Sequence, residues 1–146
     1  MEYRCIICPV DDSPLSEKGE DAAAYLSKLS GGRLILLHVV EKWYHSQAFT
    51  TDSKEWNRIH NDWLEIGRQI LKREEEKLRK EGVINIETVV RDGDAGYEIV
   101  ALAKERKADI IVMATHHYSV MGKLFSGSLI DRVTKKATCP VLWIFD

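Results

Sequence analysis

One stretch, ATHHYSVMGKLFSGS at 114–128, follows an apolar run and leads into a helical pattern. Its last two residues, Gly127 and Ser128, are typical of a phosphate-binding turn. Free backbone N–H groups and the positive end of the helix dipole favour an anion at the start of a helix. Gly127 allows a phosphate to approach closely, and the Ser128 hydroxyl can donate to one of its oxygens. The alternative is that Ser128 only caps its own helix.

Two other segments that end apolar runs carry groups suited to a nucleoside. Asp11, in PVDDS at 9–13, can accept hydrogen bonds from ribose hydroxyls or from an adenine amine. The alternative is that Asp11 or Asp12 caps the following helix. Val39 and Val40 can present backbone groups and apolar surface to a flat base, although valines in such runs are also ordinary core residues.

The elements that must position these residues alternate along the chain. Nearly continuous apolar runs predict three parallel strands buried on both faces, at 5–10, 33–40 and 108–114, and the segments 84–90 and 140–145 bring the number of strands to five. Helical periodicity predicts four helices between them, at 15–29, 53–80, 95–107 and 128–136. Ser13 with Pro14, and Asp94, are placed to begin two of these helices.

This alternation predicts an α/β fold in one domain spanning 1–146, an open parallel sheet with helices on both faces. In such sheets, ligands bind beyond the carboxyl ends of the strands, where the strand order reverses. The three candidate segments follow the first, second and fourth strands. The sequence therefore predicts that they meet at one edge of the sheet.

Composition and charge exclude several classes of function. The formal net charge of −2 over 146 residues gives no reason to expect nucleic acid or an anionic membrane as a partner. The N-terminus, MEYRCIICPVDD, does not fit a signal peptide, and no apolar run approaches the roughly 18 residues of a membrane-spanning helix. We therefore expect a cytoplasmic protein.

The cysteines include one C-x-x-C pair, Cys5 and Cys8, which raises the question of redox or zinc chemistry. Both lie in a predicted strand, where residues three apart point to opposite faces, so the thiols are expected to diverge. Reactive pairs normally lie at a turn or at a helix N-terminus. We interpret both as core cysteines and Cys139, before Pro140, as structural too.

The motifs taken together resemble the universal stress protein family over essentially the whole chain. The resembling segments are PVDDS at 9–13, LLHVV at 36–40, GDAGYEIVALAKERKADIIVMATHH at 93–117 and GKLFSGSLIDRVTKKATCPVLWI at 122–144. Nucleotide-binding members of the family carry Gly-x2-Gly-x9-Gly followed by Ser or Thr. In this sequence the motif begins at Ala114, reaches His117 and ends at Gly127 and Ser128. The spacing is intact, but both early glycines are replaced.

The resemblance implies a Rossmann-like fold of the adenine nucleotide alpha hydrolase-like type, with five strands in the order 3-2-1-4-5. It implies ATP or AMP as ligand, with Mg²⁺ as a possible companion. Asp11 would meet the ribose, Val39 the adenine, and 114–117 with 127–128 the phosphates. The candidate binding residues are Pro9, Val10, Asp11, Val39, Met113, Ala114, His117, Gly127, Ser128 and Leu129.

The two replaced glycines differ in their expected cost. Ala114 adds one methyl group, which costs little if its φ is negative. At His117, a non-glycine residue with positive φ would cost roughly 1 kcal/mol or more. Histidine tolerates that conformation better than β-branched residues do, and its ring could meet the phosphates. We therefore expect nucleotide binding of reduced affinity in a stress-response signalling module. No G-x-S-x-G or G-x-x-x-x-G-K-[ST] motif indicates an enzyme.

Two alternatives remain open from the sequence. The first is a nucleotide-free interaction module, favoured by His117, with the aromatic segment 42–63 as its recognition surface. Within that segment we expect Trp56 and Trp63 to pack on the sheet. Trp43, Tyr44 and Phe49 are left open as a mobile flap over the site. The second is a metal site built from histidines, but their spacing matches no H-x-x-x-H or H-E-x-x-H motif. The histidines concerned are His38, His45, His60, His116 and His117.

The last strand predicts self-association. Val141–Phe145 is apolar on both faces, yet the resembling fold places this strand at the edge of the sheet. An uncovered apolar edge favours pairing with another chain. We expect a two-fold homodimer through this strand, as in the family.

Overall fold

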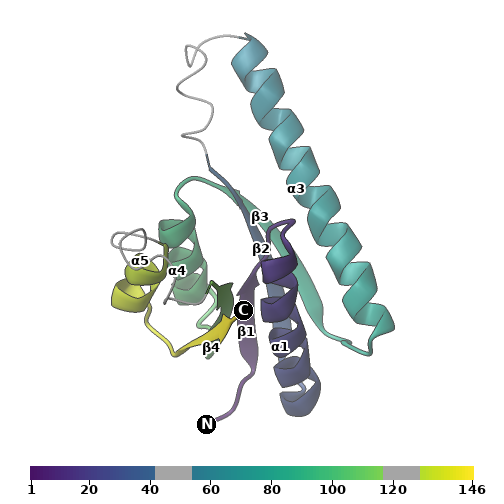
Figure 1. Ribbon diagram of the computed structural model, residues 1–146, viewed down its shortest axis with the longest axis vertical. Helices are drawn as coiled ribbons and strands as arrows, with labels where there is room; N and C mark the ends of the chain where they lie inside the picture. The colour runs from purple at the N-terminus through teal and green to yellow at the C-terminus, as the bar shows by residue number, and fades with distance from the viewer. Residues whose placement is uncertain (42–53, 117–128) are drawn as a thin grey trace.

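The computed structural model describes residues 1–41, 54–116 and 129–146. Five parallel strands form one sheet in the order β3-β2-β1-β4-β5 (Figure 1), which confirms the predicted fold class and strand order. The strand order reverses between β1, the central strand, and its neighbour β4. The strands are β1 Cys5–Pro9, β2 Arg33–Val40, β3 Ile86–Asp92, β4 Ile110–Thr115 and β5 Val141–Phe145.

Two of the helices begin at the predicted caps. Ser13 caps α1, with its Oγ accepting a hydrogen bond from Ser16 N at 3.2 Å. Asp94 caps α4, with its Oδ1 accepting from Tyr97 N at 2.9 Å. In the described ranges, no helix has both the length and the apolar composition that a bilayer crossing requires. The helices with assigned bounds are α1 Pro14–Ser30, α3 Lys54–Lys80, α4 Ala95–Glu105 and α5 Leu129–Lys136.

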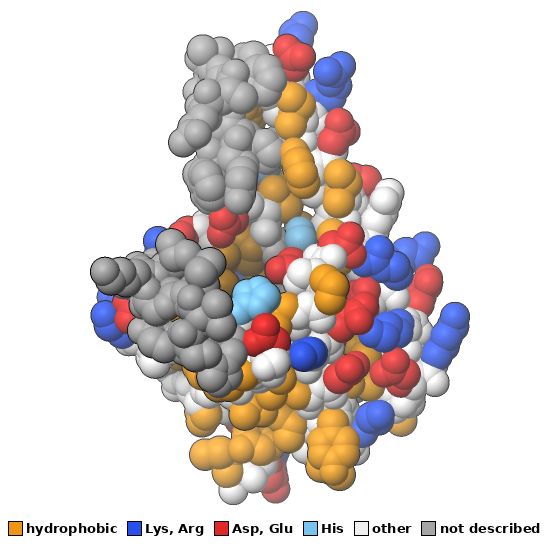
Figure 2. All heavy atoms as spheres, viewed as in Figure 1, with side chains coloured by type: hydrophobic (Ala, Val, Ile, Leu, Met, Phe, Trp, Pro, Cys, Tyr) orange, Lys and Arg blue, Asp and Glu red, His pale blue; other side chains and the backbone are white. Residues whose placement is uncertain are grey.

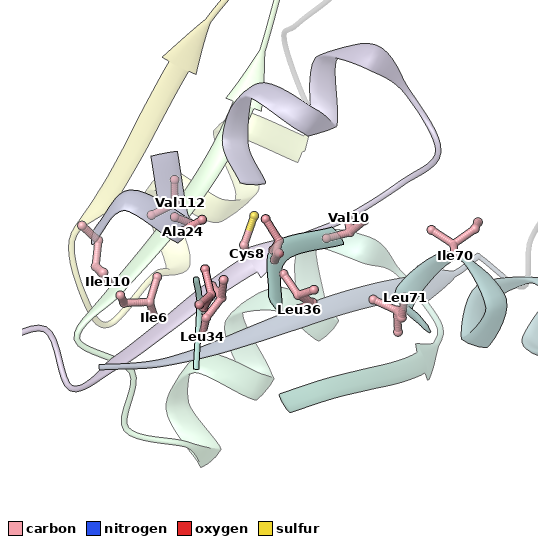
Figure 3. Close-up of a cluster of buried hydrophobic side chains, with 13 residues drawn as sticks. Ile6, Cys8, Val10, Ala24, Leu34, Leu36, Ile70, Leu71, Ile110 and Val112 are labelled. Atoms are coloured by element: carbon pink, nitrogen blue, oxygen red, sulfur yellow. The ribbon is translucent and has the colours of Figure 1, made fainter. Parts of the chain in front are cut away.

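Helices cover both faces of the sheet (Figure 1). Side chains alternate along a strand, so Ile6 and Cys8 point into the cluster beneath α1 and α3 (Figure 3). Cys5 and Ile7 point into the cluster beneath α4 and α5. The two thiols of the C-x-x-C pair therefore diverge, as predicted. Burial raises the pKa of both, which keeps them as neutral thiols at neutral pH.

Helix α3 is longer than the sheet needs, and its first half projects past the strands (Figure 1). Its second half buries Ile70 and Leu78 against the sheet. In the first half, Trp56 stacks on His60 with ring centroids 5.0 Å apart. Trp63 is 48% exposed and lines a pocket with Leu37 and Val39, so it meets the sheet at the end of β2 and not, as predicted, over its face. The helical period placed it correctly on the side of α3 from which His60 contacts β3 and Gly67 contacts β2.

Strand β3 lies later in the chain than predicted. It begins at Ile86 and ends at Asp92, whereas the apolar run suggested 84–90. The polar residues Arg91 and Asp92 belong to the strand because they pair with Val39 and Val40 of the longer strand β2. Backbone pairing, and not side-chain polarity, decides where an edge strand ends.

Candidate ligand-binding site

A pocket of about 660 Å³ lies at the carboxyl ends of β1, β2 and β4, where the strand order reverses. It brings together the described members of the predicted set, namely Pro9, Val10, Asp11, Val39, Met113, Ala114 and Leu129. The other three, His117, Gly127 and Ser128, lie outside the described residues, as do Trp43, Tyr44 and Phe49. Residues from the starts of three helices also reach the pocket: Leu15 and Ser16 of α1, Ala95 of α4 and Leu129 of α5.

The wall formed by β2 carries an unpaired stretch of backbone. Strand β1 ends with Pro9 opposite Leu37, whereas β2 continues to Val40. Leu37 O accepts from Val10 N at 2.7 Å on one side of β2, and Val40 O accepts from Gly93 N at 3.0 Å on the other. Since successive peptide groups of a strand point alternately to its two neighbours, the N–H and C=O of Val39 face the β1 side. No strand residue of β1 lies opposite them.

Asp11 is held in place by its own turn. Its Oδ1 accepts from Ser13 N at 2.9 Å and from Ser13 Oγ, and its backbone N donates to Ser16 Oγ at 3.2 Å. Ser13 is therefore the helix cap, and Asp11 orients that cap. Among the described residues, nothing donates a hydrogen bond to Asp11 Oδ2. This exposed carboxylate oxygen remains available to a ligand.

His38 is a pocket residue that sequence reasoning did not assign to the ligand site. Its Nδ1 lies 2.8 Å from Val10 O, and because a carbonyl oxygen only accepts, Nδ1 carries the proton. Its ring lies against Gly67 of α3, where an added Cβ would come within 2.7 Å of His38 Cδ2. The ring thus links β2, the end of β1 and α3. Its position next to Val39 in the sequence is the one signal that could have identified it.

Trp63 is the other missed pocket residue. It reaches the pocket from α3 and is the one described aromatic side chain that lines it. The indole is half-exposed, so it has surface left to cover a ligand. Its distance along the chain from the strand ends gave no signal of this contact.

Ala114 carries no backbone strain. Lys107 alone among the described non-glycine residues has a positive φ, so Ala114 takes an ordinary conformation. An added Cβ at Gly19 of α1 would lie 3.1 Å from Ala114 N. The helix therefore packs closely against the end of β4 because residue 19 has no side chain. The alanine at this motif position fits without displacing the pocket wall.

A larger groove of about 870 Å³ lies between α3 and β3, but most of its charged groups are paired with neighbouring side chains. Arg91 pairs with Glu98 and Glu105, and Asp92 accepts from His60 Nε2 at 3.0 Å. Within the described ranges, no three His, Cys, Asp or Glu side chains lie close enough to hold a metal ion. The pocket at the strand ends is therefore the candidate site.

Comparison with known proteins agrees with this fold. The model of the universal stress protein family matches residues 2–144. The chain is 30% identical to universal stress protein YxiE of Bacillus subtilis, over 96% of this chain and 97% of that protein. The chain belongs to the universal stress protein family. The structure of universal stress protein UspA from Lactobacillus plantarum superposes with a TM-score of 0.82 at 20% identity, over 99% of each chain.

Two solved structures of the same family hold adenine nucleotides. One is a universal stress protein in complex with cAMP, with a TM-score of 0.72 at 20% identity, covering 99% of this chain and 98% of that one. The other is the universal stress protein from Archaeoglobus fulgidus in complex with dAMP, with a TM-score of 0.67 at 23% identity and 99% coverage of both chains. At these identities the likeness establishes the fold that the chains share.

The contact between His38 and Gly67 predicts a strong coupling between two substitutions. Gly67→Ala should lower the free energy of unfolding by roughly 1–3 kcal/mol, because the new methyl group overlaps a ring that is anchored to Val10 O. In a His38→Ala background, the same change should be neutral or stabilising by up to about 1 kcal/mol, because alanine is the better helix former. A double-mutant cycle by urea denaturation measures the coupling. Additive effects would contradict the close contact.

Proposed function

We propose that this protein binds an adenine nucleotide in the pocket at the strand ends and acts as a non-catalytic stress-response signalling module. The observation that carries this proposal is that one pocket contains the N–H and C=O of Val39 and the Oδ2 of Asp11, none of which forms a hydrogen bond within the described part of the chain. An adenine edge offers both a donor and an acceptor to a strand edge, and ribose offers hydroxyl donors to a carboxylate. The complexes of related proteins with cAMP and dAMP support the same ligand class.

The size and lining of the pocket support a nucleotide-sized ligand. Its volume of about 660 Å³ falls in the usual range for small-molecule sites, roughly 300–1,000 Å³. Val39 and Met113 offer apolar surface to a base, while Asp11 and the helix starts supply the polar groups. We expect the phosphates toward Leu129, where α5 begins. Because the described carboxylates and histidines form no metal cluster, Mg²⁺ would arrive with a triphosphate, coordinated by its oxygens.

The first prediction from this proposal concerns the carboxylate of Asp11. Wild-type protein should show a melting temperature that rises with ATP, ADP or AMP, by mass action. Asp11→Asn should weaken binding by about tenfold, because a charge-assisted hydrogen bond to ribose is lost while the amide oxygen keeps the contact with Ser13. Isothermal titration calorimetry measures the nucleotide affinity of the wild-type protein and of the Asp11→Asn variant.

Asp12→Asn is the matched control for this prediction. Asp12 is the neighbouring exposed carboxylate, it pairs with Arg73 and it does not line the pocket. Its substitution should leave the affinity unchanged. No binding of any adenine nucleotide by the wild-type protein would favour the nucleotide-free interaction module, to which His117 already points.

The second prediction concerns the indole over the base. Trp63→Ala should weaken nucleotide binding by roughly 1–3 kcal/mol, the usual contribution of an aromatic side chain stacked on a base. Wild-type tryptophan fluorescence should change on nucleotide addition, and the Trp63→Phe protein should bind without most of that change. Ile66→Ala is the control, since Ile66 is comparably exposed on the same helix but does not line the pocket. Equal losses of nucleotide affinity in Trp63→Ala and Ile66→Ala would refute a specific role for Trp63.

The third prediction concerns assembly. We propose a homodimer through Val141–Phe145, because β5 ends the sheet beyond β4 and exposes Leu142 and Phe145. Light scattering should report a dimer for wild-type protein and a monomer for the Leu142→Glu/Phe145→Glu double variant. The control is Tyr25→Glu, at an exposed aromatic residue of α1. A wild-type monomer at micromolar concentration would refute the proposal.

A further inference from the structure

Two glutamates are buried between α1 and α3. Acidic and basic side chains intersperse over the outer surface of these helices (Figure 2), but Glu20 is only 1% exposed and Glu74 only 5%. The pKa of Glu20 is raised from 4.5 to about 8, chiefly by burial and also by a hydrogen bond with Glu74 and by the charge of Glu74, while the hydrogen bond from Ser16 lowers it. At neutral pH, this pair of carboxyl groups therefore holds a proton.

The hydrogen bonds indicate which group carries it. Glu74 Oε1 accepts from Arg73 Nε at 3.2 Å, and Lys77 Nζ lies 3.9 Å from Glu74 Oε2, so two cations contact Glu74. Glu20 Oε1 accepts from Ser16 Oγ at 2.8 Å. The Oε2 atoms of both glutamates are buried and accept no hydrogen bond from the described residues. A proton on Glu20 Oε2 that is donated toward Glu74 gives both of these buried oxygen atoms a role in a hydrogen bond.

The other titratable groups around Glu20 and Glu74 do not change the assignment of the proton to Glu20. On α1, Glu17 and Asp21 act on Lys77 together with the pair and hold the pKa of that ammonium high. From β1, the Cys8 thiol faces Glu20, and burial raises its pKa so that it stays neutral. Arg73 also pairs with the exposed carboxylate of Asp12. Two cations thus contact Glu74, and the charge of one of them, Lys77, also lowers the pKa of Glu20, which burial and Glu74 nevertheless hold well above its ordinary value.

A chain of hydrogen bonds joins this pair to the pocket. Asp11 N donates to Ser16 Oγ at 3.2 Å, and Ser16 Oγ donates onward to Glu20 Oε1 at 2.8 Å. Asp11 and Ser16 both line the pocket. The hydroxyl group of Ser16 thus links the carboxyl pair to the turn that presents Asp11 Oδ2 to a ligand.

We propose that the shared proton of Glu20 and Glu74 regulates the pocket, holding α1 against α3 and Asp11 in its binding position, so that loss of the proton weakens ligand binding. This inference rests on the proposed nucleotide binding. When both carboxyl groups ionise, two like charges face each other in a site that excludes water. Separation of the helices relieves the repulsion and moves Ser16, which carries the Asp11 turn. The ligand therefore prefers the protonated form.

The direction of the pH effect follows from proton linkage. The folded protein retains the Glu20 proton at pH values where the unfolded chain has released it. The free energy of unfolding should therefore fall as pH rises from about 4.5 to about 8 and then level off. Ligand affinity should fall through the upper end of the same window, because binding takes up a proton there.

The experiment compares nucleotide affinity and melting temperature between pH 6.5 and 9 in wild-type protein and in Glu20→Gln. Wild-type affinity should fall by roughly fivefold or more across this range, the usual size of a coupling between sites. Glu20→Gln should hold its neutral-pH affinity throughout, because its amide keeps the acceptor for Ser16 and donates to Glu74 in place of the proton. Its melting temperature should also depend less on pH.

Glu76→Gln is the matched control, since Glu76 is an exposed glutamate two residues from Glu74 on the same helix. This variant should keep the wild-type pH profile. Phosphate ionisation, with a pKa near 6, affects all variants equally and cancels in the comparison. If Glu20→Gln does not fold, Glu74→Gln serves instead. It removes the repelling charge and should move the midpoint of the profile to lower pH.

The outcomes separate this inference from the proposed function. Binding with the same pH profile in wild-type protein and Glu20→Gln would overturn the regulatory role and leave nucleotide binding intact. Absence of binding by wild-type protein at every pH would overturn both. In that case, a melting profile that still differs between the two proteins would show that the pair titrates without controlling a nucleotide.

Discussion

Strand β2 runs on past the end of β1, and the pocket depends on this difference in length. The last residue of β1, Pro9, pairs with Leu37, after which the chain turns through Asp11 into α1. The N–H and C=O of Val39 therefore face the space beyond the end of β1. A buried peptide group without a partner is costly, so a strand edge of this kind is either hydrated or covered by a ligand. The reversal of strand order between β1 and β4 opens the space that a ligand would fill.

Close helix packing holds the walls of this space in position. Gly67 lets α3 approach the His38 ring, and that ring fixes the Val10 carbonyl. Gly19 lets α1 approach the end of β4 at Ala114. Both contacts place backbone or ring atoms where a Cβ would stand, so each helix has one preferred position on the sheet. The buried carboxyl pair is the exception to this rigid packing, because its energy depends on a proton as well as on shape.

The sequence predicted most of the fold because its local signals agree with one another. The caps at Ser13 and Asp94, together with the apolar runs of β1, β2 and β4, all point to the same alternation. It predicted the pocket residues on strands for the same reason, since parallel strands end at a common edge. The residues that it missed reach the site from elsewhere. Trp63 arrives from the projecting half of α3, and Glu20 and Glu74 resemble solvated helix residues until the two helices are packed together.

The replaced glycine at Ala114 illustrates how a motif can change without loss of the shape it encodes. A methyl group there needs room on the side of α1, and the facing residue of that helix is Gly19. The added Cβ position of Gly19 would lie 3.5 Å from the Ala114 Cβ, so the space holds one methyl group comfortably and a second only in tight contact. The residues at positions 19 and 114 must therefore be small together, and the requirement does not fall on position 114 alone. Because Ala114 also avoids positive φ, the part of the pocket between β1, β2 and β4 keeps its form, and the end of the pocket proposed for base and ribose does not depend on the motif glycine.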